Sequence, residues 1–283
     1  MSSNVIKAFL KIIENSDVSV DGSAQGGNRV TSVGDGLEIY VKDAFAGILG
    51  AQEYSENEKM EIYNNIFSFQ NSTSRPPDLI IKNGDAIEVK KIEDNPDKVL
   101  ALNSSSPKTR ITKKDSKITN AVKDTLSDNE SKDLLYVVGT VDGVNLKNMW
   151  MVYGDCFVQD IDFYNSIFND LKSKMKKISE EIPNVNANET KEFMRLNNID
   201  LLGRTHLRVR AMYILENPNK IFEYLLKDYL GKNYICLLMR EKKFKGFPEE
   251  DKNKIKKYCS KIKIKDPENQ NQFIDAILAK SEL

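Results

Sequence analysis

Histidine and cysteine are scarce in this chain of 283 residues, which contains one histidine and three cysteines. With His206 as the single histidine, a histidine-based catalytic triad and a two-histidine metal site are excluded. Cys156, Cys236 and Cys259 are few, odd in number and far apart, which argues against a disulfide framework and a zinc site.

Long hydrophobic runs are also missing. No stretch approaches the roughly 20 apolar residues that a membrane span requires, and Met1 to Asn4 lacks the basic and apolar regions of a secretory signal. We therefore expect a soluble, cytoplasmic protein. Apolar residues make up 40% of the chain, enough for a substantial core in one large domain or in a core with an appendage.

The chain has no excess of charge of either sign, because 42 Lys and Arg balance 42 Asp and Glu. The overall charge therefore gives no indication of nucleic-acid binding. The distribution is uneven, however: residues 1–70 hold five basic against ten acidic side chains, and residues 231–265 hold twelve against four. Such segregation can attract a polyanion to one side of a folded protein.

The most informative stretch is RPPDLIIKNGDAIEVKK, residues 75–91. Two apolar runs flank Asn83-Gly84, a pair typical of a tight turn between antiparallel strands. Alternation along the second strand places Glu88 and Lys90 on one face, with apolar side chains on the other. The stretch therefore predicts a hairpin with a carboxylate and an ammonium on a shared face.

Asp78 is the residue whose placement in this hairpin depends on the loop. A two-residue loop would put Asp78 on the face opposite Glu88. We expect instead a three-residue loop with a bulge, or a bend after Pro77, either of which brings the two carboxylates together.

The order Pro-Asp78, nine intervening residues, Glu88-x-Lys90 resembles the motif of the PD-(D/E)xK nucleases. The resemblance implies that Asp78 and Glu88 hold a divalent metal, Mg²⁺, and that Lys90 assists the attacking water. Phosphodiester hydrolysis needs charge stabilisation on phosphate oxygens and hydroxide near neutral pH, and carboxylate-held Mg²⁺ supplies both. The alternative is that Lys90 is an edge-strand charge and Asp78 a turn residue.

Residues 36–49 are predicted to form a helix in which Glu38, Val41 and Phe45 lie on one side. A carboxylate beside apolar residues is costly unless it is paired or bound to metal. This segment resembles the helix before the hairpin in type II restriction endonucleases, which implies that Glu38 supplements the metal site. The alternative is an acidic residue at the helix rim, favoured there by the helix dipole.

Two further segments are predicted to contact DNA. After the Glu-x-Lys strand, a run of short hydroxyls and cations resembles the Asn-Ser-Ser stretch of NgoPII-type restriction enzymes; its candidates are Asn103, Ser104, Ser105, Lys108 and Arg110. The alternative is a surface loop.

The second segment is an expected strand over residues 206–213, in which Leu207, Val209, Ala211 and Tyr213 alternate with cations. Arginine suits both guanine edges and phosphate. The candidates for DNA binding are Arg204, His206, Arg208 and Arg210. The alternative is a solvated basic strand face.

Other periodic segments supply the predicted framework. Helices are expected over residues 5–13, 56–69, 161–182 and 248–262, and buried strands over residues 134–141, 149–153 and 234–239. The apolar face of helix 161–182 is expected to point inward, although the same face over 161–178 could instead join two chains.

These observations predict an α/β fold with a restriction-endonuclease-like core, a mixed central β-sheet flanked by helices. We expect a nuclease core over residues 1–183 and a DNA-contacting C-terminal part over residues 184–283, packed on the core as one unit. The resemblance to the NgoPII type implies a Mg²⁺-dependent type II restriction endonuclease that cuts double-stranded DNA at a short palindrome such as GGCC. It also implies a homodimer and a cognate DNA methyltransferase. The alternatives are a repair or junction-resolving nuclease with the same motif, or a non-catalytic DNA-binding module.

Overall fold

A mixed α/β architecture is present in the computed structural model, which describes residues 3–15, 17–20, 29–51, 54–70, 75–102, 105–182, 186–190 and 193–283. Within these residues the main sheet has nine strands in the order β1-β2-β3-β6-β7-β12-β14-β13, with β5 paired to β6. Their bounds are β1 Phe67–Gln70, β2 Leu79–Ile81, β3 Ala86–Glu93, β5 Arg110–Thr112, β6 Ser131–Asp142, β7 Asn145–Tyr153, β12 Tyr234–Arg240, β13 Cys259–Asp266 and β14 Asn269–Glu282. The predicted fold class is confirmed.

The centre of the sheet combines both strand directions. β3 runs parallel to β6, β6 is antiparallel to β7, and β7 is parallel to β12. The strands expected over 134–141, 149–153 and 234–239 are all present, as β6, β7 and β12. Their near-continuous apolar runs fit interior strands that are covered on both faces.

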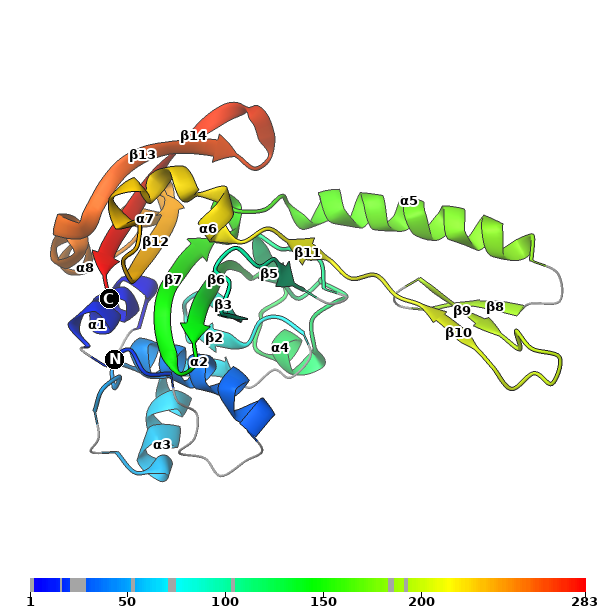
Figure 1. Cartoon of the computed structure of the whole chain (residues 1–283), viewed down its shortest axis with the longest axis horizontal. Helices are drawn as coiled ribbons and strands as arrows, with labels where there is room; N and C mark the ends of the chain where they lie inside the picture. The colour runs from blue at the N-terminus through cyan, green and yellow to red at the C-terminus, as the bar shows by residue number, and fades with distance from the viewer. Residues whose placement is uncertain are drawn as a thin grey trace.

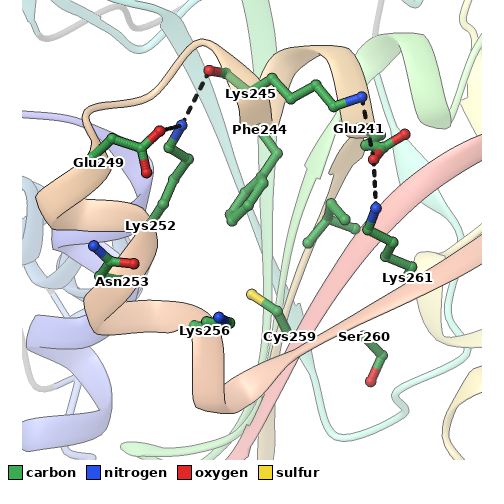
Figure 2. Close-up of a pocket in the computed structure, with 11 residues that line it drawn as sticks. Glu241, Phe244, Lys245, Glu249, Lys252, Asn253, Lys256, Cys259, Ser260 and Lys261 are labelled. Carbon is green, nitrogen blue, oxygen red and sulfur yellow. Dashed lines mark hydrogen bonds and ion pairs between the residues drawn. The ribbon is translucent and has the colours of Figure 1, made fainter.

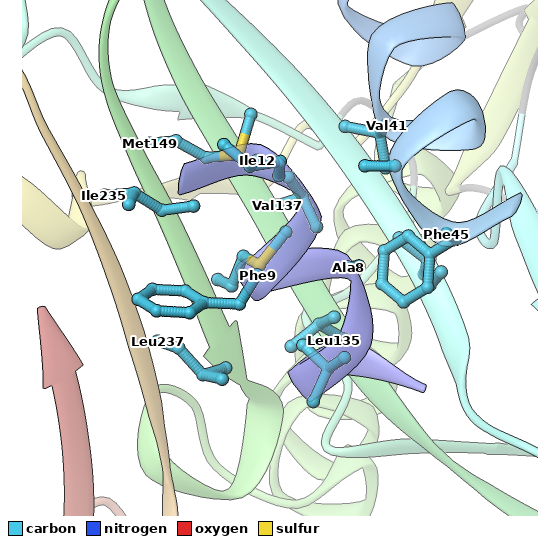
Figure 3. Packing of buried hydrophobic residues seen from close by; sticks show 14 of the residues in the cluster. Ala8, Phe9, Ile12, Val41, Phe45, Leu135, Val137, Met149, Ile235 and Leu237 are labelled. Carbon is cyan, nitrogen blue, oxygen red and sulfur yellow. The ribbon is translucent and has the colours of Figure 1, made fainter. Parts of the chain in front are cut away.

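Helices α1 Val5–Glu14 and α2 Arg29–Ala46 cover one face of the sheet. In Figure 3, Phe9 and Ile12 of α1 lie over Ile235 and Met149 of the sheet. The helix predicted over residues 5–13 is therefore confirmed. The helix predicted over 36–49 lies earlier in the chain, because α2 begins at Arg29 and Gly47 follows its end with a φ of 77°.

Helix α3 Glu56–Ile66 begins at a capping box between Ser55 and Glu58. The expected continuation to residue 69 is wrong: residues 67–70 form β1, which pairs antiparallel with β2. Pairing with a buried strand offers these residues ladder hydrogen bonds that local helical preference does not outweigh.

The C-terminal segment returns to the main sheet through β12, β14 and β13, so residues 184–283 contribute strands to the same sheet as residues 1–183. Along the chain, the short helix α6 Pro218–Ile221 comes before β12, and α7 Glu241–Lys245 and α8 Glu249–Ile255 lie between β12 and β13. The helix expected over 248–262 is too long, because residues 259–266 form β13 and pair with β14.

An arm projects from this body (Figure 1). It consists of α5 Ile161–Glu180 and a three-stranded sheet of β8 Asn186–Glu189, β9 Met194–Asn197 and β10 Leu207–Val209. The expectation that the apolar face of residues 161–182 points inward is wrong for much of its length, since Ile167, Leu171 and Ile178 are exposed.

The strand expected over 206–213 is also shorter than predicted. Only residues 207–209 pair with β9, and the next paired residues, β11 Ile214–Leu215, join β4 Leu100–Ala101. The chain changes partner between these two strands, which alternation in the sequence does not encode. A short helix, α4 Asn120–Asp124, completes the fold. Among the residues described, no helix combines the length and apolar character needed to cross a membrane.

Candidate active site

The hairpin of β2 and β3 closes through the three-residue loop Lys82–Gly84. Ile81 N–H donates to Asp85 O at 3.0 Å, and Leu79 pairs with Ile87. Continuing this register places Asp78 opposite Glu88, on the same face. The expectation of a three-residue loop is confirmed, and it removes the conflict that a two-residue loop would create.

The conformation of this loop explains why asparagine occupies position 83 and glycine position 84. Asn83 has a φ of 55°, a left-handed conformation that asparagine tolerates better than most residues. A Cβ on Gly84 would lie 2.9 Å from Ile81 Cγ2, so any side chain there would displace buried Ile81. The loop chemistry thereby fixes the register that aligns the two carboxylates.

β3 lies between β2 and β6 in the sheet; the ladder with β2 ends at Ile87, and Lys90 pairs with Val138 of β6. Glu88 is only 5% exposed, and its Oε1 accepts from Lys90 Nζ at 2.6 Å. Its Oε2 is buried without a hydrogen-bond partner in the described part of the chain. A buried carboxylate oxygen without a partner is costly, and it is a natural ligand for a cation.

Asp78 shares this environment. Its Oδ2 accepts from Val89 N–H at 2.7 Å. Burial, followed by the charge of Glu88, raises the pKa of Asp78 well above its usual value. Burial alone would lower the pKa of Lys90, but the carboxylates of Glu88 and Asp78 outweigh it and raise that pKa. The cluster therefore places two carboxyl groups beside a single ammonium.

Glu38 on α2 stands beside this pair rather than within it. Its Oε1 forms an ion pair with Lys42 Nζ at 3.0 Å, and its charge raises the pKa of both Asp78 and Lys90. No group of three or more His, Cys, Asp or Glu side chains in the described ranges is arranged to hold a metal ion. The structure thus brings Asp78 and Glu88 together and leaves Glu38 paired with a lysine.

Residues far away in sequence hold the hairpin in place. Lys132 Nζ donates to Gly84 O at 3.0 Å. Asp85, which directly precedes β3, accepts from Lys243 Nζ at 2.6 Å and from Tyr153 OH at 2.6 Å. Lys243 also contacts Asp133 at 2.8 Å. Sequence reasoning missed these tethers, because nothing in the local sequence around any of them indicates a partner that is 48 to 158 residues away.

The loop after the Glu-x-Lys strand is packed inside the protein where it is described. Ser105 and Lys108 are 6% and 0% exposed, and Lys108 Nζ pairs with Asp115 Oδ2 at 2.8 Å. The loop's backbone passes so close to Gly154 that a Cβ there would lie 2.5 Å from Lys108 O. Ser105 and Lys108 are therefore buried in this conformation, and the predicted contact of this segment with DNA stays a prediction.

Of the remaining candidates in that segment, Arg110 is exposed at the start of β5. Asn103 and Ser104 lie outside the described residues.

The basic candidates of the second segment lie on the arm. Arg204, His206, Arg208 and Arg210 are all exposed, in and beside β10. Arg208 stands directly opposite Arg195 of β9. Two like charges at facing positions of an antiparallel pair are unfavourable. The structure does not bring these residues to the hairpin; it presents them on the projecting arm.

A pocket of about 480 Å³ lies beside α7, α8 and β13, over Phe244, Cys259 and Ile277 (Figure 2). Its lysines are largely paired: Lys252 with Glu249 at 2.6 Å, and Lys261 with Glu241 at 2.8 Å. The local excess of lysine around residues 231–265 is therefore partly neutralised, and this pocket is separate from the hairpin.

A mixed sheet in which a hairpin presents two carboxylates and a lysine on one face is the arrangement of the PD-(D/E)xK nucleases. Comparison with known proteins agrees. Residues 3–270 match the NgoPII restriction endonuclease family, and the chain belongs to that family. It is 39% identical over 281 residues, covering 97% of this chain and 98% of the relative, to the type II restriction enzyme NgoPII of Neisseria gonorrhoeae. No solved structure shows significant similarity.

Proposed function

We propose that this chain is a type II restriction endonuclease, a site-specific deoxyribonuclease that hydrolyses phosphodiester bonds of double-stranded DNA. The observation that carries the proposal is the alignment of Asp78, Glu88 and Lys90 on one face of an interior hairpin. Buried ionisable groups of this kind are costly to stability, and they are found most often at catalytic or binding sites. Family membership over nearly the whole chain supports the same reaction.

The carboxylates fit a hard divalent cation such as Mg²⁺. Within the residues that the structure describes, Glu88 Oε2 is buried without a hydrogen-bond partner, and Asp78 faces it, so two oxygen-donor side chains are available. Mg²⁺ is usually held by one or two carboxylates, with waters and substrate phosphate as its other ligands, so a third protein carboxylate is not required. When bound, the ion would supply positive charge to the phosphate and lower the pKa of water.

Lys90 contributes in two ways. Its ammonium, held by Glu88 Oε1 at 2.6 Å, is positioned to donate a hydrogen bond to a phosphate oxygen or to the attacking water. Its raised pKa keeps it protonated at neutral pH, so it serves as a fixed positive charge. Glu38 would modulate the site through its charge while it is paired with Lys42.

DNA recognition is assigned to the arm and to β5. Arg204, His206, Arg208 and Arg210 would contact phosphates or guanine edges, and Arg110 lies exposed on the body. A short palindrome of GGCC type is the proposed target. A homodimer is the proposed active form, because each chain has one hairpin site and two equivalent strands must be cut. A DNA methyltransferase that protects the same sequence is the proposed genetic partner.

Digestion of plasmid DNA with Mg²⁺ tests this function. Discrete bands are expected from the parent protein, and no cutting from Lys90→Met, with binding of cognate DNA retained. Lys91→Met is the matched control, since the neighbouring Lys91 pairs with Glu93 at 2.6 Å, outside the Asp78–Glu88 cluster. A smear, or a preference for branched DNA, would indicate a different nuclease; binding without cutting by the parent would contradict the proposal.

A further inference from the structure

The loop between β9 and β10, residues 198–206, carries apolar side chains that stand out into solvent. Leu201 is 106% exposed, Leu202 is 72% exposed and Ile199 beside them is 42% exposed. The strands of the arm lie away from the main sheet (Figure 1), and this loop projects with them. Scattered exposed leucines are ordinary, but two adjacent leucines at this exposure add almost nothing to the core of their own chain. They are available to a partner.

The turn that carries these leucines is held in one conformation by Asp200. Its carboxylate accepts hydrogen bonds from the backbone N–H groups of Leu202 at 2.9 Å, Arg204 at 3.0 Å and Thr205. A backbone bond from Ile199 N–H to Thr205 O at 3.1 Å closes the same loop. Hydrogen bonds, first from the Thr205 side chain and then from these N–H groups, lower the pKa of Asp200 to about 2, so its carboxylate stays ionised at neutral pH. The leucines are therefore presented by a preorganised turn.

Positive charge surrounds this apolar turn. Residues 195–210 contain four arginines and one acidic residue, Asp200, whose carboxylate is bonded to its own turn. Across the small sheet, Arg195 of β9 stands between Arg208 of β10 and Asn188 of β8. The like charge of a second copy of this loop would repel it, whereas a polyanion would be attracted. The charge therefore favours a nucleic acid as the partner of the leucines.

We propose that Leu201 and Leu202 form a wedge that enters the base stack of double-stranded DNA, while the arginines of β9 and β10 contact the phosphates beside it. Double-stranded DNA matches both properties of the loop, because it presents apolar base faces between two rows of phosphates. Leucine is among the side chains that DNA-bending proteins insert between base pairs, which partly unstacks one step and kinks the duplex. The rigid turn reduces the cost of ordering the wedge on binding.

The wedge gives the arm a role in recognition that differs from hydrogen bonding to base edges. Contacts between arginines and phosphates position a protein on DNA but carry no sequence information. A kink, in contrast, costs least at base steps that unstack easily, above all pyrimidine–purine steps. The wedge would therefore add a preference for deformable DNA to the contacts that the arginines make.

This inference rests on the proposed function, because its partner is the proposed substrate, and the test measures binding, unstacking and cutting separately. Short duplexes that contain GGCC each carry one fluorescent analogue of adenine or guanine, at a different position within or beside that sequence. The fluorescence of such an analogue rises when the base unstacks. With Ca²⁺ in place of Mg²⁺, the parent should raise the fluorescence about twofold or more at one base step. Anisotropy of the same duplexes measures binding, and digestion with Mg²⁺ measures cutting.

Four variants separate the wedge from the rest of the protein. Leu201→Ala should abolish the rise in fluorescence, whereas Leu201→Met, which keeps a long apolar side chain, should retain it. Asp200→Ala should reduce the rise, because the turn loses the acceptor for its N–H groups while both leucines remain. Leu230→Ala is the matched control: Leu230, just before β12, is 75% exposed, and its loss should change none of the three measurements. Unchanged melting curves would show that the variants fold.

The outcomes distinguish the wedge from the nuclease activity. A parent that binds and cuts the duplexes while no analogue brightens would overturn the inference and leave the proposed function intact, and so would a Leu201→Ala variant that unstacks DNA like the parent. Unstacking that depends on Leu201, in a protein that cuts no DNA with Mg²⁺, would support the inference and refute the proposed function. A parent that binds no duplex would overturn both and leave the leucines to a contact with another protein.

Discussion

Replacing Asp78 with asparagine should make the protein more stable and inactive at the same time. Asparagine keeps an oxygen that can accept from Val89 N–H, the contact now made at 2.7 Å, but it removes a negative charge buried beside Glu88. Active-site groups held for function commonly cost stability, and their removal gains about 0.5–2 kcal/mol. For a protein of this size, a gain of about 1 kcal/mol raises the melting temperature by roughly 2–4 °C.

The direction of the pKa shift at Asp78 determines how the stability difference between Asp78→Asn and the parent changes with pH. Burial and Glu88 raise the pKa of Asp78 in the folded chain, so the folded chain holds this proton more tightly than the unfolded chain does. The stability associated with the bound proton is present below the unfolded pKa and is lost as the pH rises through the folded pKa. The advantage of Asp78→Asn should therefore be absent in acid and grow toward neutral pH.

Thermal melting from about pH 4 to about pH 8, with and without Mg²⁺, measures this effect. Without metal the variant should melt higher at the upper pH. Added metal should stabilise the parent, by about 2.7 kcal/mol at one hundred times the dissociation constant, and should affect the variant much less. Glu93→Gln, an exposed carboxylate at the end of the same strand, should change neither result. A variant that melts below the parent at pH 8 without metal would refute the reasoning.

Three further predictions follow from the site. Lys243→Met should lower the cleavage rate at saturating DNA roughly tenfold or more with little change in DNA affinity, because Lys243 anchors Asp85 at 2.6 Å; Lys243→Arg should recover part of the rate, and equal rates for parent and Lys243→Met would contradict the tether. Ca²⁺ in place of Mg²⁺ should support binding with little cutting, since its longer bonds and looser geometry place water poorly; full activity in excess EDTA would exclude a metal mechanism. Arg208→Ala or Arg210→Ala should cost about 1–3 kcal/mol in binding of cognate DNA if the side chain reads a guanine, measured by titration at fixed salt; unchanged affinity would mean that the basic strand is a solvated face.

Local sequence determined the chemistry of the hairpin. Alternation placed Glu88 and Lys90 on one face, and the turn residues Asn83 and Gly84 located the loop, because strand periodicity and turn geometry depend on neighbours along the chain. The buried strands β6, β7 and β12 were predictable for the same reason. The requirement that both carboxylates share a face left either a three-residue loop or a bend after Pro77, and the structure has the three-residue loop.

The tertiary structure decided what depends on distant partners. Residues 67–70 form a strand because β2 lies beside them. Lys108 is buried because its ammonium pairs with Asp115 and its backbone packs closely against Gly154. The periodicity of α5 showed that the helix is amphipathic, but the same pattern fits a core helix and an interface helix equally well. Only the folded chain shows which part of that face its own arm covers and which part it leaves exposed, since burial is a property of packing and not of sequence spacing.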